Sequence, residues 1–187
     1  MTRRPAAHLA VISVLLLAGC DLAPIGFPGI GLEQPAPAKP AAQEDEPPPQ
    51  EPAAAQVACP IGTPRSYTDT WLAPRSGGRL HMGVDMLAPT GTPVYAHQSG
   101  VVLRMSRNTL GGITLSLHAD SGDHFYYAHL SGYTDGLETG QRVRAGDHIA
   151  HTGDTGNAAG TPHLHFEARP GGGDNVNPFP LVQRACG

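Results

Sequence analysis

Five residues carry side chains that bind metals or transfer protons: His81, Asp85, His129, His163 and His165. Imidazole nitrogens and carboxylate oxygens are ordinary zinc ligands, and catalytic zinc sites use three protein ligands and keep a fourth position open for water. Imidazoles that do not bind the metal can accept the proton of that water. The set therefore predicts a hydrolase with one zinc ion.

The spacing of these residues has a geometric meaning where the chain is extended, because residues two or four apart in a strand point to one face. His81 and Asp85 would share a face, with Gly83 between them. Residues 163–168 alternate, with His163, His165 and Glu167 on one face and Leu164, Phe166 and Ala168 on the other. A strand that is apolar on one side and rich in ligands on the other is expected beside a metal site.

A second interpretation is that ten histidines in 187 residues produce part of this pattern by chance. A lone His-x-His in a strand is more often a surface or structural pair than a metal site. The complete set favours the metal, because each element lies within or ends an apolar, strand-like run. Glu167 is a candidate to orient a ligand, and Arg79 is a candidate to line the groove. The other histidines are expected at strand ends, in turns or on the surface: His97, His118, His124, His148 and His151.

Residues 1–19 are predicted to form a lipoprotein signal peptide. Arg3 and Arg4 precede an apolar run, 10–18, that is too short to span a bilayer. The run ends in Leu17-Ala18-Gly19-Cys20, which resembles a bacterial lipobox and implies cleavage before Cys20 and acylation of that residue. Its acyl chains would anchor the protein to a membrane. An ordinary signal peptide with a coincidental cysteine is the alternative.

Residues 20–56 are predicted to be the lipidated Cys20 followed by a disordered tether. This stretch is rich in Pro, Ala, Glu and Gln and has no large apolar residue after Leu32, so it cannot bury a core. Asp21 follows the cysteine directly and resembles a signal that retains lipoproteins in the inner membrane. We therefore expect a lipid-anchored envelope protein that faces the periplasm, at the inner rather than the outer membrane.

Residues 57–187 have a length that suits one domain. Nine Arg and no Lys face ten acidic residues there, and this near balance predicts no nucleic-acid partner. Cys59 and Cys186 lie near the two ends of the domain. In an oxidising compartment we expect them to form a disulfide, with free thiols as the alternative.

The same region shows almost no helical periodicity. Short β-type runs alternate with Gly, Pro, Asn and Asp, which predicts an all-β fold built mainly from antiparallel strands. The predicted strands are 92–96, 100–105, 113–118, 124–130, 148–152 and 163–168.

A series of short motifs follows the order found in one known family: His81-Met-Gly-Val-Asp85, Ala88-Pro-Thr-Gly-Thr-Pro-Val94, Tyr126-Tyr-Ala-His-Leu130, Gly153-Asp-Thr-Gly-Asn157, Pro162-His-Leu-His-Phe-Glu167 and Asn177-Pro178. Together they resemble the lysostaphin/LytM-type zinc endopeptidases, which cut peptidoglycan. The resemblance covers about residues 69–181. It implies long loops that form a groove over one Zn²⁺ ion, with peptidoglycan as the partner.

Position by position, the resemblance implies that His81, Asp85 and His165 bind the zinc. It also implies that His129 and His163 orient and deprotonate the water. Some members lack ligands and serve as silent murein-binding or amidase-activating modules. This chain keeps all five positions, which favours an endopeptidase acting on cross-links or stem peptides. A purely structural zinc site is disfavoured, because such sites use four protein ligands.

Departures from the family pattern concern loop shape. Leu110-Gly111-Gly112 stands where relatives often have Gly-Tyr-Gly, and one proline rather than two precedes His163. There is no asparagine between Cys20 and His81, which argues against latency through an asparagine that caps the zinc. The sequence identifies no regulatory envelope protein.

Overall fold

The computed structural model describes residues 56–187. The predicted signal peptide 1–19, the acylated Cys20 and all but the last residue of the predicted tether 20–56 lie outside the described residues. Within the described part, no helix has the length and apolar character of a membrane span.

Nine strands form the domain, and each strand pairing within residues 56–187 is antiparallel. They are β1 (Ser66–Tyr67), β2 (Val84–Leu87), β3 (Pro93–Tyr95), β4 (Gly100–Asn108), β5 (Gly112–Ala119), β6 (His124–Tyr133), β7 (Arg142–Val143), β8 (His148–Thr152) and β9 (His163–Arg169). The main sheet has the order β1-β2-β9-β6-β5-β4-β7, and β8 pairs with both β3 and the end of β6. The prediction of an all-β, mainly antiparallel fold is confirmed.

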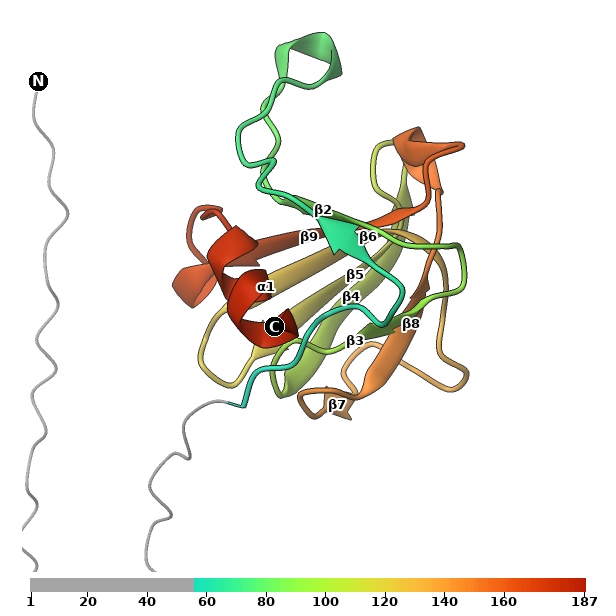
Figure 1. Ribbon diagram of the computed structural model, residues 1–187. Helices are drawn as coiled ribbons and strands as arrows, with labels where there is room; N and C mark the ends of the chain where they lie inside the picture. Colours follow the sequence, from blue (N-terminus) through green and yellow to red (C-terminus); the bar gives the residue numbers. More distant parts are fainter. Residues whose placement is uncertain (1–55) are drawn as a thin grey trace, which may run out of the picture. The chain divides into compact units, whose positions relative to one another are not determined.

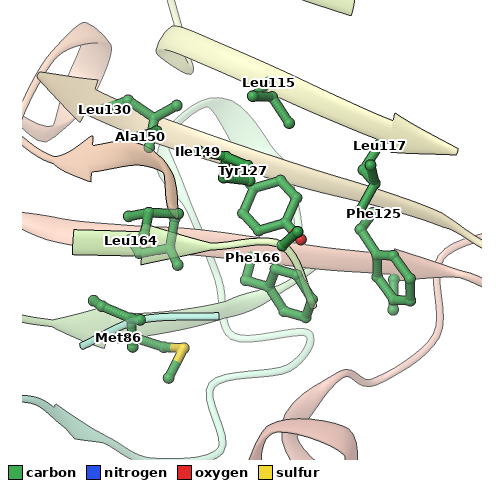
Figure 2. Packing of buried hydrophobic residues seen from close by; sticks show 14 of the residues in the cluster. Met86, Leu115, Leu117, Phe125, Tyr127, Leu130, Ile149, Ala150, Leu164 and Phe166 are labelled. Carbon is green, nitrogen blue, oxygen red and sulfur yellow. The ribbon is translucent and has the colours of Figure 1, made fainter. Parts of the chain in front are cut away.

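The alternation predicted for 163–168 is present in β9. Leu164, Phe166 and Ala168 are buried in the core, whereas His165 and Glu167 lie on the opposite, partly open face. Figure 2 shows this core from close by, with the rings of Phe125 and Tyr127 beside Phe166 and with Met86 nearer to Leu164. One face of the main sheet is therefore sealed by apolar packing, and the other face is free to carry polar groups.

Short segments complete the apolar side of the sheet. The β3 and β8 strands contribute Val94 and Ile149 to the same core, and the N-terminal segment adds Ile61. A helix, α1 (Phe179–Cys186), contributes Val182. This helix was not predicted, because eight residues span only about two turns and give little periodic signal. Figure 1 shows α1 at the C-terminal end of the chain, against the strands.

Two features tie the ends of the described domain to this core. Cys59 and Cys186 form a disulfide with a Cα–Cα distance of 4.7 Å, which confirms the predicted pair. His97 is 1% exposed, so the prediction that it lies at the surface or in a turn was wrong. Its ring packs edge-on against Phe125 and Phe166. Its Nδ1 donates to the backbone carbonyl oxygen of Ala58 at 2.7 Å. A histidine with this partner satisfies one ring nitrogen and otherwise packs as an aromatic side chain.

Candidate metal centre

The register of β2 and β9 creates the centre of the site. Asp85 lies directly opposite His165 in this antiparallel pair, and both side chains point away from the apolar core. His81 precedes β2 and is not in a strand, so the expectation that His81 and Asp85 share a strand face was wrong. His81 is instead held by backbone hydrogen bonds to Leu72 and Ala73, in the segment that leads from β1 to β2.

Gly83 allows this approach. A Cβ atom at this position would lie 2.5 Å from the carbonyl oxygen of Phe166 and 2.8 Å from Cε1 of His165. Any side chain would therefore push His165 or the backbone of β9 away. The glycine between His81 and Asp85 is required by close packing against the second histidine.

Three potential metal-ligand atoms meet at one point. Asp85 Oδ1 lies 2.9 Å from His81 Nε2 and 2.9 Å from His165 Nδ1. The two ring nitrogens are themselves 2.9 Å apart. These three residues form the group, within residues 56–187, whose ligand atoms all lie within 4.8 Å of one another.

The remaining ring nitrogens decide the tautomers. His81 Nδ1 lies 2.8 Å from the carbonyl oxygen of Thr70, which can only accept, so Nδ1 carries the proton. His165 Nε2 lies 3.1 Å from a carboxylate oxygen of Glu167 and donates to it. In the neutral rings, His81 Nε2 and His165 Nδ1 therefore carry no proton, and their lone pairs point toward the Asp85 carboxylate. Three acceptors that face one another need a cation between them, and their chemistry fits zinc.

The electrostatics agree with a site that attracts positive charge. Burial alone would raise the pKa of Asp85, but the rings of His165 and His81, which donate hydrogen bonds to it when they are protonated, hold this pKa far below its usual range. Burial alone would lower the pKa of His165, yet Asp85 and Glu167, which both accept hydrogen bonds from the protonated ring, raise it. Asp85 and His165 thus favour a proton or a metal ion at the point where the three ligand atoms meet.

Two further histidines face the same point. His163 Nδ1 donates to the carbonyl oxygen of Thr161 at 2.7 Å, which leaves its Nε2 lone pair 3.6 Å from Asp85 Oδ1. His129 Nδ1 donates to the carbonyl oxygen of Thr155 at 2.8 Å. The rings of His129 and His163 have centroids 4.6 Å apart. Their Nε2 atoms are therefore free acceptors beside the donor group.

His129 has an unusual backbone. Its φ is +61°, a left-handed conformation that few residues other than glycine adopt. It lies where β6 changes partner, since Ala128 pairs with β9 and Leu130 pairs with β8. Thr155 accepts the His129 ring proton at its carbonyl oxygen, and its hydroxyl donates to the carbonyl oxygen of Leu130. The turn 153–157 thus fixes a kinked strand and aims one histidine.

Burial keeps His129 neutral. The pKa of His129 falls to about 4, first because of desolvation and then because of the neighbouring His163 and His165. At pH 7 the ring therefore offers a lone pair at Nε2 rather than a second N–H donor.

Sequence reasoning missed Arg75. Its guanidinium lies 2.5 Å from Asp85 Oδ2, the carboxylate oxygen that does not face His81 and His165. Glu167 was a candidate to orient a ligand, and the structure places it on His165, where Arg169 and Asn175 donate to its other oxygen. Arg75 belongs to none of the motifs in the sequence, and its contact with Asp85 is set by the fold.

The site opens into a cleft of about 710 Å³. The five predicted residues all line it, as does Arg79, which was expected to line the groove. The floor is the polar face of β4, β5, β6 and β9, and the rim includes the 75–82 and 157–163 segments. In Figure 1 the segment between β1 and β2 extends beyond the sheet and ends in a short 3-10 turn, Ser76–Gly78.

An antiparallel sheet whose polar face presents a His–Asp–His group and two more histidines defines a class of metallohydrolase domain. Residues 79–178 match Peptidase family M23, and the chain belongs to this family. Membership implies a bound metal ion, for which the donor group described above is suited.

Relatives of known name share this domain. The chain is 37% identical over 115 residues to the L-Ala–D-Glu endopeptidase of Bacillus subtilis (strain 168), a match that covers 57% of this chain and 35% of that protein. It is similar in structure to a zinc containing peptidase from Vibrio cholerae, with a TM-score of 0.57 and 28% identity over 65% of this chain and 39% of that one. It also resembles the catalytic domain of lysostaphin from Staphylococcus simulans, with a TM-score of 0.56 and 29% identity over 63% of this chain and 92% of that one. The chain thus spans about a third of the length of the Bacillus relative.

Proposed function

We propose that this chain is a zinc-dependent endopeptidase that hydrolyses peptide cross-links or stem peptides of peptidoglycan. The observation that carries the proposal is the meeting of three potential metal-ligand atoms at mutual distances of 2.9 Å: His81 Nε2, Asp85 Oδ1 and His165 Nδ1. The names of the relatives, peptidoglycan endopeptidases among them, support the choice of substrate.

The chemistry divides between the metal and two histidines. Zinc held by His81, Asp85 and His165 would acidify a water molecule and polarise the scissile carbonyl. His129 and His163 point unprotonated Nε2 atoms into the same space, so each can accept a proton from water. The protonated ring can then donate to the nitrogen of the leaving amine.

Groups around the five residues keep these roles distinct. The carbonyl oxygens of Thr155 and Thr161 hold the Nδ1 protons of His129 and His163, so each ring presents Nε2 to the cleft. Glu167 holds His165 from behind, and Arg75 holds the outer oxygen of Asp85. The alternative of a silent, murein-binding or amidase-activating module gives no reason for five side chains that converge on one point of the cleft.

Digestion of purified sacculi tests the proposal. The zinc-loaded full-length chain is expected to release soluble peptides with newly exposed amino termini, which mass spectrometry identifies together with the bond that is cut. His163→Ala is expected to abolish release, whereas His151→Ala, a substitution on β8 outside the cleft, leaves it intact. Intact sacculi after incubation with well-folded, zinc-loaded protein would reject the enzymatic proposal in favour of the silent module.

Envelope tethering is a separate proposal. We infer from Leu17-Ala18-Gly19-Cys20 that the mature chain begins at an acylated Cys20 and that the 20–56 stretch links it to the domain. Cys20→Ser is expected to block incorporation of labelled palmitate and to leave the precursor uncut, and fractionation of the wild type is expected to place it at the inner membrane. Palmitate incorporation that persists in Cys20→Ser would contradict this assignment.

A further inference from the structure

The cleft contains more positive charge than its own carboxylates use. Four arginines and two acidic residues line it: Arg75, Arg79, Arg104, Arg169, Asp85 and Glu167. Arg75 is paired with Asp85, and Arg169 is paired with Glu167. The two carboxylates are therefore fully engaged. Arg79 donates to the backbone carbonyl oxygen and the hydroxyl of Ser76, so among the described residues Arg104 is the cleft arginine whose guanidinium has no such partner.

A β-bulge in β4 places Arg104 at the cleft. The register of β4 against β5 shifts between Val102 and Arg104, so Leu103 is bulged and half-exposed while Arg104 lies opposite Ser116. A β-bulge re-aims the following side chains, and here it brings Arg104, Ser106 and Asn108 to the cleft face. Within residues 56–187, Arg104 forms no ion pair with a carboxylate.

The position of Arg104 relative to the metal centre follows from the sheet. Cross-strand partners run from Arg104 to Ser116 on β5, then to Tyr126 on β6, then to Glu167 on β9. Glu167 is on the same strand face as His165, two residues away. Three strand spacings separate Arg104 from β9, which is roughly 14 Å.

The floor between these points suits an extended peptide. It combines small side chains, Ser106, Ser116 and Ala128, which leave room for a backbone, with the ring of Tyr126, which lies between Ser116 and Glu167 in the cross-strand row. Fourteen ångströms corresponds to roughly four residues of extended chain. A substrate whose scissile bond lies at the metal centre thus presents a side group about four residues away to Arg104.

We propose that Arg104 binds a free carboxylate of the substrate peptide and makes the domain selective for anionic stem peptides over uncharged oligoglycine bridges. The inference rests on the proposed endopeptidase function. Guanidinium groups bind carboxylates through two parallel hydrogen bonds, and carboxylates are the anionic groups of a peptide. In stem peptides they come from D-glutamate and from diaminopimelate.

Matched substrates test the proposal and separate the two carboxylates. Three synthetic cross-linked stem peptides are compared: one with all carboxylates free, one with the D-glutamyl α-carboxyl amidated, and one with the diaminopimelyl carboxyl amidated. With the zinc-loaded full-length wild type, we expect kcat/KM to fall about tenfold or more on one of the amidated peptides, as for loss of a charge-assisted hydrogen bond, and mainly through KM.

Two variants locate the effect. Arg104→Gln is expected to lower kcat/KM by a similar factor on the free peptide and to leave the sensitive amidated peptide unchanged, because the interaction is already absent there. Arg107→Gln removes the same charge from the same strand, but Arg107 is exposed and does not line the cleft, so it should match the wild type on every substrate. Zinc content and the midpoint of thermal unfolding check that both variants are folded.

The outcomes distinguish two kinds of failure. If the wild type cleaves all three peptides equally well, or if Arg104→Gln and Arg107→Gln behave alike, the carboxylate inference is wrong and the proposed function stands. If the wild type cleaves none of the three peptides and no sacculi, the proposed function is wrong and this inference with it.

Discussion

Removal of the Glu167 carboxylate is expected to weaken metal binding although Glu167 does not belong to the donor group. Glu167 accepts the Nε2 proton of His165 at 3.1 Å and thereby directs the Nδ1 lone pair toward Asp85. Burial alone would raise the pKa of Glu167, but hydrogen bonds from His165 and Asn175 lower it, so the group is ionised at pH 7. A charged acceptor behind the ring makes the opposite nitrogen more basic.

The size of the effect follows from this arrangement. Changes to the partners of metal-binding histidines typically cost 10- to 100-fold in affinity, which corresponds to about 1.4 to 2.7 kcal/mol. Glu167→Gln keeps an acceptor oxygen and is expected near the lower limit. Glu167→Ala removes the acceptor and also frees Arg169 and Asn175, so it is expected near the upper limit.

Competition with a fluorescent zinc chelator measures this directly on the full-length protein. Glu138→Gln is the matched control, because Glu138 is exposed and lies outside the cleft. Equal zinc dissociation constants for the wild type, Glu138→Gln and both Glu167 variants would refute the view that Glu167 orients His165.

Three further predictions concern the two histidines proposed to be catalytic, the disulfide and the buried histidine. His129→Ala and His163→Ala are each expected to keep their zinc by metal analysis while kcat falls by about 10² to 10⁴; near-wild-type turnover in either would remove its proposed role. Cys59→Ser with Cys186→Ser is expected to lower the free energy of unfolding by about 2 to 4 kcal/mol, and urea titrations that match the wild type would contradict this. Burial lowers the pKa of His97, so below about pH 6.5 the unfolded chain binds a proton that the folded domain does not. Stability should therefore fall on acidification from pH 7 to pH 5, less steeply in His97→Gln; identical pH profiles would show that His97 does not contribute.

The elements that follow simple alternation were predictable. In β9 the apolar residues Leu164 and Phe166 are spaced by two, and the polar partners His163 and His165 occupy the other face, so both the core and half of the site could be inferred before any coordinates. The boundaries were less accurate, since β4 extends to Asn108 and β6 to Tyr133. Polar ends of strands carry little hydrophobic signal, and their pairing is decided by neighbours.

The parts that depend on tertiary contacts were not predictable from local pattern. His81 reaches the site from a non-strand segment held by Thr70 and Ala73, and nothing in its spacing to Asp85 distinguishes this from a strand. His97 is polar by type but packs on Phe125 and Phe166 in the core. A backbone acceptor close to one ring nitrogen makes such burial tolerable, and that acceptor is far away in sequence.

Arg75 shows a related limit. Its partner Asp85 is ten residues away, across a segment with no regular period, so only the folded chain brings the two together. The turn 153–157 was recognised as a motif, but its function became clear only from the structure, where Thr155 holds the ring of His129. Short motifs thus identify which residues matter, and contacts identify what they do.

Anomalous X-ray diffraction at the zinc edge, from crystals of the zinc-loaded protein, tests the central claim most directly. The account predicts one strong peak within roughly 2.0 to 2.2 Å of His81 Nε2, Asp85 Oδ1 and His165 Nδ1, with His129 and His163 beyond bonding distance. A peak bonded to His129 or His163 in place of one of these three residues, or no peak in the cleft of a crystal that contains stoichiometric zinc, would contradict it.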